Sequence, residues 1–540
     1  MTVSTSENVR KRATTESTTE DKTEKGGRSE KMGLFGAISY IVGNIVGSGI
    51  FITPGSILNQ VHSVGLSMIV WVLAAFISML GSFCYVELGT SIRVSGGDFA
   101  YLCFMKWYPV AFAFMSIGCT INYPATLAIQ AQTFSEYIFT AFDVVMDSTS
   151  EYWAKKLLGF SLIWLLLFMN FFSLKTFVSK FQIVVIFAKI AATGLVIGIG
   201  FYYLIFKGDT ENIKQPFHGT TFTIGTFVNA LFAGLFSYDG WDILNFGAEE
   251  IDRPKRTMPL AIVIGMVCIA IIYAAVNFSY FVVLPVSVIE DSPAVAMALA
   301  KQTLGKASFI MPIFVALLLI GSLNSTMFSA SRYLQAVAKQ GHLPSAISGL
   351  NPICDSPRVA LFIHVLISMA ISFTGNLDNL INYVSFAQWS QRAITMIIVM
   401  YIKIRHVPVH PDGIRMPFVM PLLFCFVCSS LVIITIIESF NEAAVGLGIL
   451  LGGLIVYLIF VWERTLSSVK AYQKIMGDIN ESTTKFAQIV FDVMPERCSE
   501  EDASRAIGQT PQVLSSKTVD TTSNYDIERA SSHSEESTRL

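Results

Sequence analysis

Two glycine-rich interruptions inside long apolar stretches are the parts of this chain best suited to bind a ligand. The first runs from Gly43 to Phe51 and reads GNIVGSGIF, and the second runs from Gly234 to Asp242 and reads GLFSYDGWD. A helix that breaks deep in a bilayer is tolerated only where its freed backbone groups line a protein-buried cavity. Paired breaks in corresponding positions of two halves indicate the substrate site of a secondary transporter.

The chemistry expected at the two breaks is complementary. Around Gly47, Ser48 and Gly49, free backbone N–H groups at the start of a half-helix suit a carboxylate. The second break would leave unpaired carbonyl oxygens around Phe236, Ser237 and Asp239, which suit an ammonium group. Together the breaks predict recognition of a zwitterion. The alternative is helix packing, because Gly43 and Gly47 also form a GxxxG pair.

Two aromatic residues, Phe236 and Trp241, flank the second break. An aromatic ring there could cover a bound apolar side chain and close one side of the membrane, and the adjacency to the break favours this interpretation. Such rings could equally pack inside the protein.

The composition predicts an all-α polytopic membrane protein. The 540 residues are 53% hydrophobic and 14% charged, with a mean hydropathy of +0.58. Apolar runs near the length that a bilayer core demands recur along most of the chain. About twelve spans are expected, with cores at 36–57, 66–91, 108–134, 157–174, 179–206, 224–247, 259–284, 308–336, 359–374, 380–404, 417–438 and 443–462.

Three segments follow from this pattern. Residues 1–32 are polar and predict a disordered cytosolic arm, residues 33–462 form the transmembrane domain, and residues 463–540 form a largely disordered cytosolic tail with a helix-like segment at 469–493. Lysine and arginine gather in the loops on the side of the N-terminus, so both termini are predicted to be cytoplasmic. No soluble enzymatic domain remains, so no enzymatic activity is expected.

Cysteines and charge predict no metal, cofactor or nucleic acid. The eight cysteines fall in spans or on the cytosolic side, where free thiols are expected. Cys425 and Cys428 lie one turn apart on an apolar helix, which favours packing over metal binding. The net charge of −2 gives no sign of a nucleic-acid partner.

Lys189 stands in the middle of the apolar run FAKIAA. A lysine inside a span is costly and is a functional candidate. The alternative is a different helix border, with the ammonium group reaching the membrane interface.

The motifs resemble the L-type light-chain branch of the amino acid–polyamine–organocation superfamily. The resemblance spans about residues 33–462. It rests on Gly47 to Phe51 followed by Thr53-Pro54, Tyr85 to Gly89 with Ser95-Gly96-Gly97, Phe236 to Glu250 with Arg253-Pro254, and Ser331-Arg332 with Gly341 to Pro344. It implies an inverted repeat of five plus five helices with two C-terminal helices, and sodium-independent exchange of amino acids.

The resemblance also implies roles for individual residues. It places the substrate carboxylate on Ser48 and Gly49 and the amine on the carbonyls of Ile45 and Phe236, with Phe236 as the gate. The ammonium of Lys189 would occupy the ion site of sodium-coupled relatives, bracing the first helix against the eighth near Ser322 and Ser325.

Two positions depart from the pattern of many relatives. Asp239 stands where many neutral-amino-acid members have glycine and some members with cationic substrates have aspartate, so it is either a cation site or a helix cap. Gln388 stands where asparagine is frequent, and it either touches substrate or makes an inter-helix hydrogen bond.

The expected partners are amino acid substrates, the lipid bilayer and a scaffold protein. The loop from Gln132 to Phe160 has no cysteine, so a disulfide-linked glycoprotein heavy chain is not expected, while a non-covalent one stays open. Thr538 and Leu540 give the C-terminus the form of a PDZ-binding motif.

The function predicted is a sodium-independent plasma-membrane exchanger of neutral, large L-amino acids that works by alternating access. Cationic amino acids are a second substrate class. The alternative function is an amino-acid sensor on a transporter scaffold.

Overall fold

The structure is a computed structural model. It describes residues 33–92, 97–142, 146–172, 175–208, 210–242, 244, 251, 253–339, 342–410, 413–462 and 464–494. Almost all regular structure in these residues is helical. The predicted arm at 1–32 and the PDZ motif lie outside the described residues.

The first apolar span is broken, as the glycine run predicts. Helix α2 (Leu34–Ile45) and helix α3 (Gly49–Val61) meet at an angle of 51° across a break of three residues. Gly47 and Gly49 flank Ser48, and glycine lowers the helical preference at this point by roughly 1 kcal/mol per residue relative to alanine. The break therefore falls where the helix is weakest.

Within the described residues, eight further helical segments are long and apolar enough to cross a membrane. They match eight of the expected spans. They comprise α4 (Val64–Ser91), α6 (Tyr108–Ile117) with α7 (Tyr123–Ala141), α8 (Ser148–Phe171), α9 (Lys175–Tyr202), α11 (Pro254–Val283), α13 (Val295–Leu304) with α14 (Ile310–Lys339), α17 (Val419–Glu438), and α18 (Phe440–Val456).

The three remaining expected spans, at 224–247, 359–374 and 380–404, also contain helices. These helices are α10 (Ile224–Ser237), α15 (Arg358–Ile371) and α16 (Leu377–Arg405). Helix α10 ends at Ser237, at the second predicted break, and turns follow through Asp242. Residues 243 and 245–250, where that span would continue, lie outside the described residues. A polytopic helical membrane protein is thus confirmed.

The structure contains several local features that the pattern of apolar spans does not predict. A π-helical turn, Gly118–Asn122, joins α6 to α7, and the short helices α5 (Gly97–Phe104) and α12 (Val286–Asp291) lie between spans. Helix α8 begins nine residues before the expected core, because Asp147 caps it by accepting a hydrogen bond from the N–H of Ser150 at 3.0 Å. Hydrogen bonds from the side chain and the N–H of Ser150 hold the pKa of Asp147 below its usual value.

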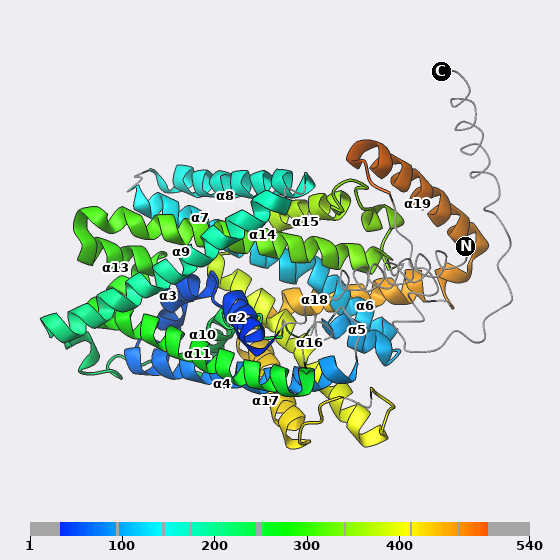
Figure 1. Ribbon diagram of the computed structural model, residues 1–540. Helices are drawn as coiled ribbons and strands as arrows, with labels where there is room; N and C mark the ends of the chain where they lie inside the picture. Colours follow the sequence, from blue (N-terminus) through cyan, green and yellow to red (C-terminus); the bar gives the residue numbers. More distant parts are fainter. Residues whose placement is uncertain are drawn as a thin grey trace, which may run out of the picture. The chain divides into compact units, whose positions relative to one another are not determined.

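The helices pack so that both broken spans are enclosed. Helix α10 packs on α3 and α4, α11 packs on α2 and α4, and α14 packs on α7 and α9. Figure 1 shows α2, α3 and α10 among these longer helices. The buried core clusters around both breaks and includes Ile45, Ile50, Leu235 and Trp241.

A last amphipathic helix, α19 (Lys470–Phe491), falls within the segment for which the sequence predicts a helix. The side-chain amide oxygen Oδ1 of its Asn480 accepts hydrogen bonds from the N–H and the hydroxyl of Ser345, at 2.9 and 3.0 Å. Ala487 is buried beside the connection between α14 and α15. In Figure 1 α19 lies beside the ends of these two helices. The tail is therefore anchored to the transmembrane domain as far as Met494.

Candidate functional site

The two breaks touch each other at Gly49 and Ser237. A methyl group placed on Gly49 would lie 2.6 Å from the Cα of Ser237 and 3.0 Å from its Oγ. The hydroxyls of Thr53 and Ser237 share a hydrogen bond of 2.6 Å. Only glycine permits this approach, so the glycine of the first break sets the distance between the two half-helices.

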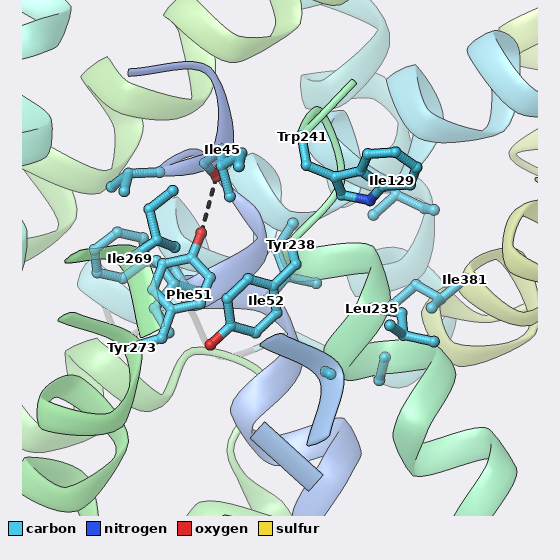
Figure 2. Close-up of a cluster of buried hydrophobic side chains, with 14 of the residues drawn as sticks. Ile45, Phe51, Ile52, Ile129, Leu235, Tyr238, Trp241, Ile269, Tyr273 and Ile381 are labelled. Carbon is cyan, nitrogen blue, oxygen red and sulfur yellow. Dashed lines mark hydrogen bonds between the residues drawn. The ribbon is translucent and has the colours of Figure 1, made fainter. Parts of the chain in front are cut away.

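Tyr273 of α11 ties the C-terminal ends of both half-helices together. Its hydroxyl lies 2.8 Å from the carbonyl oxygen of Ile45 and 3.0 Å from that of Ser237, so one proton is shared between two helix ends. Figure 2 shows the Tyr273 hydroxyl directed at Ile45, with Tyr238 beside it. These two carbonyls are among those left without an intrahelical donor when a helix stops. The sequence analysis did not identify Tyr273.

A second cross-link joins the turns. The side-chain amide of Asn44 donates to the carbonyl oxygen of Gly240 at 3.1 Å. Gly240 has a φ of +98°, a conformation that favours glycine, and a methyl group there would lie 2.3 Å from the Asn44 amide nitrogen. Glycines on both sides thus allow the two interrupted backbones to lie together.

The N–H groups of the first break are available to an anion. Ser48 precedes α3, and its side chain makes no capping hydrogen bond. Within the described part of the chain, the backbone N–H groups of Ser48 and Gly49 donate to no acceptor. Both residues are buried, so these donors lack bulk water as well. This is the arrangement that would hold a carboxylate.

The carbonyl oxygens assigned to the amine already accept hydrogen bonds. That of Ile45 accepts from Tyr273, and that of Phe236 accepts from the N–H of Asp239 at 3.2 Å. A carbonyl oxygen has two lone pairs, so that of Ile45 keeps one acceptor site, whereas that of Phe236 also accepts from the N–H of Tyr238. Gly47 lies beside Ser322, whose Oγ would be 3.8 Å from a methyl group on Gly47.

The two flanking aromatics occupy different environments. Phe236 is partly buried. Trp241 is 1% exposed, and its ring meets that of Tyr85 edge-on at a centroid distance of 5.1 Å. Figure 2 shows Trp241 near Ile129. The exposed surface of Phe236 leaves this ring the freer of the two to move.

Asp239 and Gln388 are brought together, and an arginine that the sequence analysis missed joins them. The amide nitrogen of Gln388 lies 3.3 Å from Asp239 Oδ2, and Arg392 Nη2 lies 2.6 Å from Asp239 Oδ1. The Arg392 side chain is buried, with 6% exposed, whereas that of Asp239 is 36% exposed. A lone arginine in the apolar span 380–404 was the available signal.

Lys189 reaches the first span. Its Nζ donates to the carbonyl oxygen of Gly43 at 3.1 Å, near the C-terminal end of α2. Ser322 accepts from the side-chain amide of Gln130 at 3.1 Å, and Ser325 is exposed. The ammonium group of Lys189 therefore contacts the first span at Gly43. Its role as a brace during transport stays a prediction.

We expect Lys189→Met to lower amino acid counterflow about tenfold, because hydrogen bonds to charged groups contribute about 1.5–3 kcal/mol. Uptake by purified protein in liposomes, with and without sodium, measures this. The matched control is Lys207→Met, since Lys207 is exposed beyond the end of α9 with its ammonium over the Tyr203 ring. Equal activity of the two variants would remove the role of Lys189.

A cleft lies elsewhere, between α7 and α8, and it includes Gln132, Tyr152, Lys156 and Ser372. Lys156 donates to the carbonyl oxygen of Ser372, and Lys155 pairs with Glu136 at 2.6 Å. Its residues are distinct from those at the two breaks. The N–H groups of Ser48 and Gly49 lie at the first break instead, and the zwitterion site there stays a prediction.

Comparison with known proteins identifies the family. The family model described as amino acid permease matches residues 32–461. Amino acid transporter protein 6 of Caenorhabditis elegans is 68% identical over 481 residues, which cover 89% of this chain and 92% of the relative.

Two more distant relatives also match. The cystine/glutamate transporter of Homo sapiens is 32% identical over 88% of this chain and 92% of the relative. The b(0,+)-type amino acid transporter 1 of Mus musculus is 31% identical over 86% of this chain and 93% of the relative. These relatives are named as transporters, which agrees with the prediction of a non-enzymatic protein. The chain belongs to the amino acid permease family, as its resemblance to the L-type branch predicted.

Proposed function

We propose that this protein exchanges neutral L-amino acids across the plasma membrane without sodium, by alternating access. The observation that carries the proposal is the meeting of two half-helix ends, where free N–H groups at Ser48 and Gly49 lie close to the carbonyls of Ile45 and Ser237. A carboxylate on the first set and an ammonium on the second would define an α-amino acid. Gly47, Phe236 and Trp241 would surround it.

Sodium independence is supported by Lys189. Its ammonium group already makes a hydrogen bond to the first broken span, at Gly43. A fixed positive charge at this place would do what a bound cation does in ion-coupled transporters, which is to hold the half-helix carbonyls in position. Ser322 lies beside Gly47 and would complete this bracing.

The decisive experiment is counterflow with purified full-length protein in liposomes. Vesicles loaded with unlabelled leucine should accumulate labelled leucine equally in sodium and in choline buffers. Saturable binding without counterflow would instead favour an amino-acid sensor, and uptake that requires sodium would contradict the ion-site proposal.

The gate is proposed to be Phe236, from its partial exposure at the second break. We expect Phe236→Ala to lower maximal counterflow about tenfold while changing leucine binding less than about threefold, because the ring would close the site after binding rather than hold the ligand. Phe426→Ala on α17, where the side chain is 69% exposed, is the control. Parallel losses in binding and turnover would reject a gating role.

The placement in the cell is also a proposal. The lysine and arginine bias puts both termini in the cytoplasm, and Thr538 and Leu540 would then be free to bind a PDZ scaffold. Deleting Leu540 should alter distribution in polarised cells and leave counterflow by the purified protein unchanged. A disulfide-linked heavy chain is not part of this proposal, because residues 132–160, which include the connection between α7 and α8, contain no cysteine.

A further inference from the structure

An ion pair stands at the second break, where a substrate side chain would extend. Asp239 follows the end of α10 by two residues, and its carboxylate is bonded at both oxygens, by Arg392 at 2.6 Å and by Gln388 at 3.3 Å. The Asp239 side chain is 36% exposed and that of Arg392 is 6% exposed, so the acid is the accessible member of the pair.

Two tryptophan rings lie against the arginine. Its guanidinium carbon lies 4.8 Å from the ring centroid of Trp241 and 4.9 Å from that of Trp389. Trp241 belongs to the turn after α10, while Trp389 and Arg392 belong to α16. An arginine stacked on aromatic faces and paired with a carboxylate is fixed in position and charge.

The environment of the pair contains further acids. Asp98 accepts a hydrogen bond from the hydroxyl of Thr395, which lies one turn after Arg392 on α16. Asp242, close in sequence to Asp239, also interacts electrostatically with Arg392. Without the arginine this region would hold several carboxylates and no matching cation among the side chains described around it.

A lysine or arginine substrate would need a carboxylate for its side-chain cation. In this protein the cation already present on Asp239 is Arg392, and displacing it would leave a buried arginine without its partner, a costly arrangement. A neutral side chain displaces nothing. The site would thus exclude substrates with cationic side chains because Arg392 already occupies the Asp239 carboxylate, and not because a carboxylate is lacking.

We propose that Arg392 is an internal counterion that occupies the side-chain cation position on Asp239 and thereby restricts the site to amino acids with uncharged side chains. This inference rests on the proposed function, since it names the substrate class of the same site. It makes Arg392 a specificity-determining residue and Asp239 its partner. Gln388 keeps the carboxylate oriented towards the arginine.

The test measures uptake of labelled L-leucine, L-lysine and L-glutamate by full-length protein in leucine-loaded liposomes. Arg392→Gln should raise the lysine-to-leucine uptake ratio about tenfold, because it frees the Asp239 carboxylate. Asp239→Asn should raise the glutamate-to-leucine ratio by a smaller factor, because Arg392 loses its hydrogen-bonded partner but still interacts with Asp242. The double variant should return both ratios to those of the wild type.

The opposite directions of these changes separate specificity from stability. A purely structural role would lower uptake of all three substrates together and leave their ratios unchanged. The control is Ile397→Ala on the same helix, whose side chain is 43% exposed. A lysine-to-leucine ratio in Arg392→Gln within about twofold of the wild type would overturn the proposal.

Wild-type protein provides a second measurement if a variant fails to fold. L-leucine should raise the melting temperature of the purified wild-type chain, while L-lysine at the same concentration should not. Equal shifts, or no shift with leucine, would overturn the role of Arg392. Absence of counterflow of any amino acid by the wild type would reject the proposed exchange, while the melting comparison would still decide the role of Arg392.

Discussion

Gly49→Ala should abolish amino acid transport while leaving expression of the protein intact. The added methyl group would lie 2.6 Å from the Cα of Ser237, which is backbone and cannot rotate away. The half-helices α3 and α10 would have to separate, and overpacking of this kind costs about 1–3 kcal/mol or more. We therefore expect counterflow at a tenth of the wild-type rate or below, since about 1.4 kcal/mol corresponds to tenfold.

The control for this variant is Gly448→Ala on α18, where a methyl group would meet nothing within 4 Å. Both variants add the same methyl group to a glycine in an apolar segment. The measurements are counterflow in liposomes and the elution profile of the purified protein. Gly49→Ala with wild-type counterflow would show that the two breaks can separate without consequence, which the proposed site does not allow.

The location of the breaks could be predicted from the sequence. Glycines spaced by two and four residues inside an apolar run lower the helical preference locally, and α2 ends at Ile45 and α3 begins at Gly49, inside the predicted run. The second break follows in the same way, with α10 ending at Ser237. Local composition decides both, so the prediction needed no knowledge of tertiary contacts.

The reason for Gly49 could not be predicted from the sequence. The need for free N–H groups explains why a glycine is favourable in the break but does not require one at position 49. The structure shows that Gly49 contacts Ser237, a residue 188 positions away along the chain. Which faces of α3 and α10 meet depends on how each helix is rotated. The sequence pattern leaves that rotation undetermined, because the residues of α3 are nearly all buried.

Arg392 illustrates the difference between a signal and its meaning. An arginine inside an apolar span is conspicuous for the same reason as Lys189, yet the sequence argument selected Gln388, one turn earlier on α16. The partner Asp239 is 153 residues away. A charged residue in a span predicts that a partner exists, whereas the identity of that partner comes only from the packing of α10 and α16.

Tyr273→Phe should weaken both substrate binding and the stability of the fold. The hydroxyl is shared between the carbonyl oxygens of Ile45 and Ser237, and Tyr273 is fully buried. Phenylalanine keeps the ring and removes the donor, so a buried acceptor is left unpaired at a cost of about 1–3 kcal/mol. Because these carbonyls belong to the ends that would hold the substrate amine, the KM for leucine should rise about tenfold.

The matched control is Tyr280→Phe on the same helix. Tyr280 is also buried, at 1% exposure, and its hydroxyl has no hydrogen-bond partner in the described part of the chain. Removing that hydroxyl deletes no bond, so melting temperature and KM should stay at wild-type values or the melting temperature should rise. If the two variants behave alike, Tyr273 acts only as a packed ring. A loss confined to Tyr273→Phe would instead show that one shared proton aligns the two half-helix ends.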